Sequence, residues 1–109
     1  MIRMRLHNEP FCLIKKGEKR IEARLYDKKR RVLFVDDIIE ITNRKTKKKL
    51  LVKIVKLQFF KSFKNLYDNF EANVLGENEK EKLIKDIYKY YSKEDEKKLG
   101  VLAIRFELV

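Results

Sequence analysis

The sequence predicts a single α+β domain. We expect a sheet of about five or six mostly antiparallel strands, curled toward a barrel, with three or four helices packed around it. The chain has 109 residues, which is enough for one domain and leaves little room for two. Several segments alternate apolar and polar residues, as half-buried strands do, and others repeat apolar residues at helical spacing. Hydrophobic residues make up 44% of the chain, a share typical of folded domains and too high for a disordered chain.

The first half of the chain is predicted to contain one short helix and then strands. The helix begins at Asn8 and ends before Gly17, a residue that commonly terminates helices. Strands are expected at residues 19–26, 32–35, 38–42 and 50–60. The last two are separated by a polar turn, so they should pair as an antiparallel hairpin.

The second half is predicted to be mainly helical before a final strand. Ser62 is placed to cap a short helix, and residues 79–91 form the longest predicted helix. Ser92 begins one more short helical turn, which Gly100 closes. Residues 101–109 alternate again and are expected to end the chain as a strand.

The charge of the chain favours polyanionic partners. Lys and Arg number 28 against 17 Asp and Glu, which gives a net charge of +11. Basic residues cluster in two turn-like segments, 28–31 and 45–49. RNA is the first partner that such a balance suggests, followed by DNA. The alternative is a lysine-rich surface with no such partner, because charge alone reports on association and solubility rather than on fold.

Several function classes are excluded by what the sequence lacks. No apolar run approaches the length of a membrane span, and the N-terminus carries no hydrophobic signal segment, so we expect a cytoplasmic protein without a membrane partner. Cys12 is the only cysteine, and we interpret it as a core residue. His7 is the only histidine, so neither a metal site nor a catalytic triad is expected, and His7 is interpreted as exposed or capping. No glycine-rich phosphate loop is present, and no cofactor is expected.

One short segment is more specific than the composition. Residues 17–24 read G-E-K-R-I-E-A-R, which resembles the G-x-K-x-x-E-x-R signature of the ASCH domain family. Further segments match the family in the same order, at residues 35–40, 62–67 and 90–106. The chain is therefore similar to this family over almost its whole length, residues 1–109, as a single domain.

The resemblance implies a fold and a function. ASCH domains belong to the PUA-like superfamily of small RNA-associated β-barrels, with a cleft between the sheet and its helices. It implies that RNA or a modified nucleoside binds in a cleft floored by the signature residues. The ligand-binding residues that we expect on this basis are Lys16, Lys19, Arg20, Glu22, Arg24 and Tyr26.

A second implication of the resemblance is hydrolysis. Some family members are similar to ribonucleases, and a small bacterial branch hydrolyses N4-acetylcytidine with a Lys, a Thr and a Glu. The Lys falls on Lys19, whereas Glu22 stands at the Thr position and Asn73 at the Glu position. If the protein is an enzyme, Lys19 and Glu22 are the expected catalytic residues. A third interpretation is a protein-interaction module whose cleft binds a peptide.

The polar face of the signature strand has chemistry that suits a nucleotide. Glu22 and Arg24, two residues apart, share a strand face, whereas strand alternation does not require Lys19 to touch Glu22. A carboxylate accepts from an exocyclic amine, and an arginine holds a phosphate with two donors or stacks on a base. Tyr26, expected on the same face, is suited to stacking on an unpaired base. The alternative is an ion pair on an open sheet surface, which contributes little stability.

Overall fold

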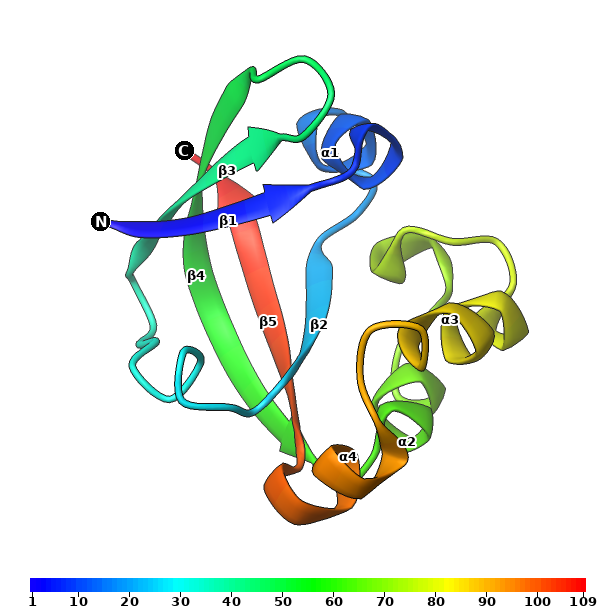
Figure 1. Cartoon of the computed structure of the whole chain (residues 1–109). Coiled ribbons are helices and arrows are strands. Elements are labelled where there is room, and N and C mark those ends of the chain that lie inside the picture. The colour runs from blue at the N-terminus through cyan, green and yellow to red at the C-terminus, as the bar shows by residue number, and fades with distance from the viewer.

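The protein is a curled five-stranded sheet with helices gathered at two places around it (Figure 1). The computed structural model describes residues 1–109. Its strands are β1 (Ile2–Leu6), β2 (Ile21–Leu25), β3 (Ile38–Asn43), β4 (Lys49–Phe60) and β5 (Val101–Leu108). Its helices are α1 (Asn8–Lys15), α2 (Phe63–Asp68), the 3-10 helix η1 (Asn73–Leu75), α3 (Lys80–Ile87) and α4 (Lys93–Leu99).

The sheet has the order β1-β3-β4-β5-β2, which makes β1 and β2 its two edges. β3 and β4 form the antiparallel hairpin that the sequence predicts, and β4 also pairs antiparallel with β5. Only the contact between β1 and β3 is parallel. Because the sheet curls while β1 and β2 do not pair with each other, it forms a half-barrel with an open seam between its edges.

Two hydrophobic clusters hold the fold together. The larger cluster of 12 buried residues lies inside the curl, where Phe11 and Ile14 of α1 pack against strands such as β3 and β4. The smaller cluster of 8 buried residues joins β2 and β5 to the helices, with Phe63 and Leu66 of α2 fully buried. The second cluster fixes α2, α3 and α4 as a group on the β2 side of the sheet (Figure 1).

Several predicted boundaries are confirmed. Ser62 caps α2, because its side-chain oxygen accepts from the backbone N–H of Asn65. Ser92 caps α4 in the same way, accepting from Asp95, and Gly100 follows the last helical residue with a positive φ.

Two predicted elements were wrong, and one strand was missed. Residues 32–35 do not form a strand, because the Asp37 carboxylate accepts from the N–H of Phe34 and folds this segment into a turn. The helix predicted over 79–91 ends at Ile87, and residues after it continue in tight turns. Strand β1 was not predicted, although Ile2, Met4 and Leu6 alternate with two arginines.

None of the helices combines the length and the apolar character that crossing a bilayer demands.

Candidate functional site

A cleft of about 330 Å³ lies at the seam between the two edge strands. β1 and the start of α1 supply one side, β2 supplies the floor, and α3 with the turn after it supplies the other side. The residues that line it are Arg5, Leu6, His7, Pro10, Lys19, Ile21, Glu22, Ala23, Arg24, Arg44, Tyr67, Leu75, Leu83, Asp86, Ile87, Tyr90 and Tyr91. The cleft therefore draws its lining from segments that are far apart in the sequence.

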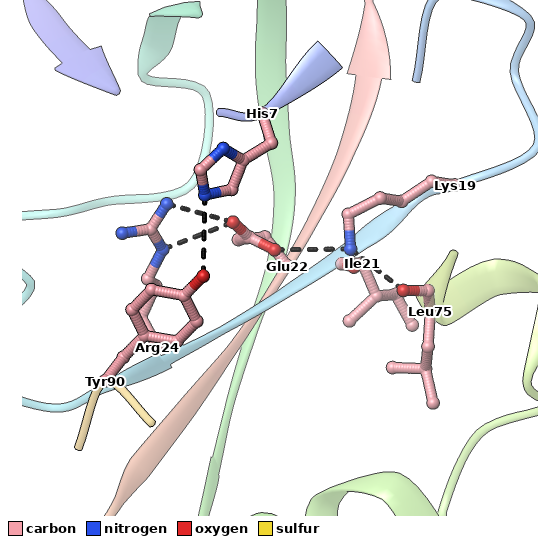
Figure 2. A network of polar contacts seen from close by, with 7 residues as sticks. All are labelled: His7, Lys19, Ile21, Glu22, Arg24, Leu75 and Tyr90. Carbon is pink, nitrogen blue, oxygen red and sulfur yellow. Dashed lines mark hydrogen bonds and ion pairs between the residues drawn. The ribbon is translucent and has the colours of Figure 1, made fainter. Parts of the chain in front are cut away.

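Three charged side chains of the signature segment form one network on the floor of the cleft (Figure 2). Glu22 lies at the centre: its Oε1 is 3.2 Å from Nζ of Lys19, and its Oε2 accepts from Nε and Nη2 of Arg24 at 3.2 and 3.0 Å. The side chains of Glu22 and Arg24 are only 14% and 19% exposed. This network excludes the interpretation of an ion pair on an open sheet surface, and it brings Lys19 and Glu22 into contact.

Lys19 is held in place by the main chain as well. It is 7% exposed, and its Nζ donates to the carbonyl oxygens of Ile21 and Leu75 at 2.8 and 2.9 Å. With the carboxylate of Glu22, these carbonyls give the ammonium three acceptors, one for each of its protons. These three contacts hold the ammonium group of Lys19 against the floor of the cleft.

A glycine makes room for Lys19. Gly76 follows η1 with φ +85°, and a Cβ built there would lie 2.8 Å from Cδ of Lys19. Both the backbone conformation and the close approach therefore favour glycine at this position. The turn that Gly76 closes carries Leu75, whose carbonyl accepts from Lys19.

Electrostatics keep the central carboxylate ionised. Burial alone raises the pKa of Glu22, but the charges of Lys19 and Arg24, and their hydrogen bonds, outweigh it and lower the pKa below its ordinary value. Burial lowers the pKa of Arg24, and the opposing charge of Glu22 more than compensates, so the pKa of Arg24 is raised. The floor thus presents a fixed negative acceptor beside a fixed planar cation.

Aromatic side chains form the helical side of the cleft. Tyr67 and Tyr91 lie deeper in the cleft, and Tyr90 is exposed near its opening. Burial and the negative charge of Glu22 raise the pKa of Tyr67, so its hydroxyl stays protonated. The hydroxyl of Tyr90 lies 3.4 Å from Nε2 of His7, and this contact passes from the helical side to the β1 side of the cleft (Figure 2).

Two arginines add positive charge on the β1 side. Arg5 and Arg44 line the cleft and are exposed. Arg44 is positioned by its N–H, which donates to the carbonyl of Leu6, and by the preceding Asn43. Asn43 is buried, and its side-chain oxygen accepts from the N–H groups of Lys45 and Thr46, so it shapes the basic turn that follows β3.

The structure divides the six expected ligand-binding residues into two groups. Lys19, Glu22 and Arg24 line the cleft together. Lys16 and Arg20 are exposed near the end of α1 and lie outside it. Tyr26 follows β2, which ends at Leu25, and it also lies outside the lining of the cleft.

Tyr26 is occupied by other contacts. Its ring packs edge-on against Phe59 at 4.8 Å between centroids, and the guanidinium of Arg31 lies 4.9 Å from the ring centre. Tyr26 packs against the larger hydrophobic cluster, which also contains Leu102 and Ile104, the cross-strand partners of Arg24 and Glu22.

Sequence reasoning missed the cleft residues that come from other segments. His7 is exposed, as interpreted, yet it lines the cleft, and so do Arg5, Arg44 and Tyr90. The only signal for this side of the cleft was the alternation of arginines with apolar residues in β1. Cys12 is half-buried on α1 and lies outside the cleft.

Of the three positions that the hydrolase interpretation compares, Lys19 and Glu22 line the cleft together. Asn73 lies outside its lining, and Glu22 is engaged by two cations. No three His, Cys, Asp or Glu side chains come close enough together to hold a metal ion.

Comparisons with known proteins agree with this architecture. The family model of the ASCH domain matches residues 4–109. A crystal structure of the hypothetical protein PH0355 is 37% identical, with a TM-score of 0.86, over 98% of this chain and 97% of that one. The solution structure of protein PF0455 from Pyrococcus furiosus is 33% identical, with a TM-score of 0.76, over 99% of this chain and 96% of that one.

A more distant structure shares the fold. The ASCH domain from Lactobacillus crispatus JV V101 has a TM-score of 0.68 at 19% identity, over 89% of this chain and 68% of that one. No curated protein shows significant similarity to this chain.

Proposed function

Since this chain belongs to the ASCH domain family, we propose that it binds RNA and that its cleft receives one nucleotide, or a modified nucleoside, of that RNA. The observation that carries the proposal is the ionised Glu22 beside Arg24 on the floor of a cleft with a cationic side. An acceptor with little access to solvent next to a planar donor can hydrogen-bond the edge of an unpaired base.

The shape and lining of the cleft support a nucleotide-sized ligand. Its volume of about 330 Å³ is at the lower end of the range of small-molecule pockets, so it suits one base with its sugar rather than a long segment. The remaining lone pairs of Glu22 would accept from the exocyclic amine of cytosine or adenine. Tyr90 offers an exposed aromatic ring for stacking near the opening.

Basic side chains around the cleft would contact the RNA backbone. Arg5 and Arg44 lie within the cleft itself, and the basic turn of residues 45–49 continues from Arg44. Lys16 and Arg20 would contact phosphates outside the cleft. This arrangement predicts affinity that depends strongly on salt, because phosphate contacts release counterions.

Salt-titrated binding to single-stranded RNA and transfer RNA tests the proposal. We expect Arg44→Gln to weaken RNA binding several-fold and to reduce the slope of log affinity against log salt by about 1. Lys53→Gln is the matched control, because Lys53 is an exposed cation on β4 outside the cleft. It should leave affinity nearly unchanged.

The proposal fails if the wild-type protein binds neither RNA at low salt. It also fails if Arg44→Gln and Lys53→Gln weaken binding equally, because binding would then be a general effect of net charge. Nuclease-resistant protein partners in a pull-down, without RNA binding, would favour the protein-interaction module instead.

A further inference from the structure

A second surface lies next to the floor of the cleft, on the same face of the sheet. Arg24 of β2 and Phe59 of β4 both pair with Leu102 of β5, which lies between them. Paired residues of neighbouring strands project from the same face of a sheet. Because neighbouring strands are about 4.8 Å apart, Arg24 and Phe59 are separated by roughly 10 Å across that face.

Tyr26 continues this face beyond the end of β2. Its N–H donates to the carbonyl of Gly100 at 3.0 Å, which extends the pairing of β2 with β5 by one residue. Leu25 packs in the smaller hydrophobic cluster and Tyr26 against the larger one, so the alternation of faces continues as well. The edge-on contact between the rings of Tyr26 and Phe59 therefore connects the strand of the cleft floor to the end of β4.

Phe59 presents an aromatic ring to solvent. Its side chain is 60% exposed, whereas Phe60, the next residue of β4, packs edge-on against Phe70 on the helical side of the sheet. A single exposed apolar residue is common on protein surfaces, so the surroundings of Phe59 decide what it can bind.

The surroundings of this ring are cationic. The guanidinium of Arg31 lies 4.9 Å from the centre of the Tyr26 ring, and Lys28 and Lys29 of the same turn are exposed. None of these three cations takes part in an ion pair. Unpaired cations beside an exposed aromatic ring are the combination that binds single-stranded nucleic acid, because bases stack on the ring while phosphates contact the cations.

We propose that Phe59 and Arg31, which Tyr26 joins, form a second nucleotide subsite beside the cleft, so that the ligand is a single-stranded RNA segment of at least two nucleotides and not a free nucleoside. This inference rests on the proposed function, since it places the nucleotide adjacent to the one in the cleft. The base of this second nucleotide stacks on Phe59, and its phosphate contacts Arg31. The short distance to the cleft floor favours a strand that already occupies the cleft over an anionic membrane.

Binding of short RNA and of mononucleotides separates the two subsites. The probes are the hexamers of cytidylate and of adenylate and the 5′-monophosphates of the same two bases, titrated by NMR at constant ionic strength. We expect the wild type to bind at least one hexamer about tenfold more tightly than its monophosphate, the contribution of one stacked base. Phe59→Leu keeps an apolar side chain but removes the ring. It should weaken hexamer binding at least about fivefold and change monophosphate affinity less than about twofold.

Two further variants control for structural effects. Leu51 is 41% exposed on the same strand, and it lies outside the cleft and roughly 26 Å from Phe59 by strand rise. Leu51→Ala should leave both affinities nearly unchanged. Phe59→Tyr retains the aromatic ring and should bind the hexamer within about twofold of the wild type.

The salt dependence of binding tests the role of Arg31. Arg31→Gln should reduce the slope of log affinity against log salt by about 0.7 for the hexamer and leave the slope for the monophosphate unchanged. Phe59→Leu removes no charge, so it should weaken hexamer binding without changing the slope. Lys53→Gln, the exposed cation on β4, should leave both slopes unchanged.

The outcomes for the two proposals are distinct. If the hexamers bind and Arg44→Gln weakens them but Phe59→Leu does not, the second subsite is wrong and the proposed function stands. Equal losses of hexamer and monophosphate affinity in Phe59→Leu would also overturn the subsite, because the ring would then act on the cleft itself. Binding to phosphatidylserine vesicles that depends on Phe59, without an effect on the hexamers, would make this surface a membrane contact instead. If neither hexamers nor monophosphates bind at low salt, both proposals fail.

Discussion

At the scale of single residues, Glu22 controls the charge of the cleft floor. It is the only anion between two cations that have little access to solvent, so its loss would leave Lys19 and Arg24 facing each other unpaired. We expect Glu22→Gln to lower the free energy of unfolding by about 3 kcal/mol, as removal of one partner from a buried ion pair does. Urea denaturation at pH 7 measures this change.

Glu40→Gln is the control for that experiment. Glu40 also contacts two cations, Arg3 and Lys49, but both of these side chains are largely exposed. Glu40→Gln should lower the free energy of unfolding by less than about 1 kcal/mol. Equal costs at the two positions would contradict a buried network.

The pH dependence of stability in the wild type and in Glu22→Gln gives an independent check of the buried network. The pKa of Glu22 is lowered in the folded state, so its contribution to stability is present above the unfolded pKa of about 4.3 and is lost as pH falls through the folded pKa. The difference between wild type and Glu22→Gln should therefore be largest near neutral pH and shrink below about pH 4.

The sequence predicted the residues of the cleft floor and little else of the site. Lys19, Glu22 and Arg24 belong to one continuous segment, so a local motif was sufficient to find them. His7 and Tyr90 come from other segments, and only the tertiary fold brings them to the two sides of the cleft. Local patterns in the sequence carry no signal for such a contact, because 83 residues separate the two.

At the scale of elements, Glu96 joins three helices. It is 7% exposed on α4, its carboxylate accepts from the N–H of Phe63 at the start of α2 at 2.7 Å, and it also accepts from the hydroxyl of Tyr88, just after α3, at 2.8 Å. We expect Glu96→Gln to lower the free energy of unfolding by about 2 kcal/mol, because it weakens charge-assisted hydrogen bonds. Chemical denaturation is the measurement.

Glu94 offers the matched control on the same helix. Glu94 lies in the first turn of α4 and is exposed, where its charge interacts favourably with the helix dipole. Glu94→Gln removes that interaction and should lower the free energy of unfolding by less than about 1 kcal/mol. Equal effects at both positions would show that Glu96 acts only through the dipole.

Alkaline pH probes the same junction. Burial and the hydrogen bond to Glu96 raise the pKa of Tyr88 to about 12. Its contribution to stability is therefore present below the ordinary pKa of about 10 and is lost as pH rises toward 12. Tyr88→Phe has no hydroxyl to titrate, so it should lose less stability than the wild type between about pH 10 and about pH 12.

Elements were predictable where a local pattern was strong. The hairpin of β3 and β4 and the caps of α2 and α4 follow from alternation and from Ser62 and Ser92. The end of α3 was not predictable, because tight turns after Ile87 keep apolar residues such as Tyr91 on the inner side without extending the helix.

At the scale of the whole molecule, the excess of positive charge opposes folding. With a net charge of +11 on 109 residues, repulsion between exposed lysines should weaken as salt screens it. We expect the unfolding temperature to rise when sodium chloride increases from about 0.02 M to about 0.5 M. A fall would mean that surface ion pairs outweigh the repulsion.

A double variant tests the origin of this effect. Lys28→Glu with Lys29→Glu changes two exposed positions and removes four units from the net charge of +11. Its unfolding temperature should respond less to salt than that of the wild type. The α+β fold class followed from periodicity, but the open seam did not, because it depends on which strands fail to pair.

That seam has a consequence for how recognition could diversify. Strands β1 and β2 each have a pairing partner on one side only, so their other main-chain edges border the cleft. The backbone donors and acceptors of these edges remain after almost any substitution, and the side chains of the edge strands can be replaced without removing the backbone hydrogen bonds between paired strands. Single substitutions of the side chains that line the cleft can therefore change which ligand binds, while every backbone pairing of the sheet is retained.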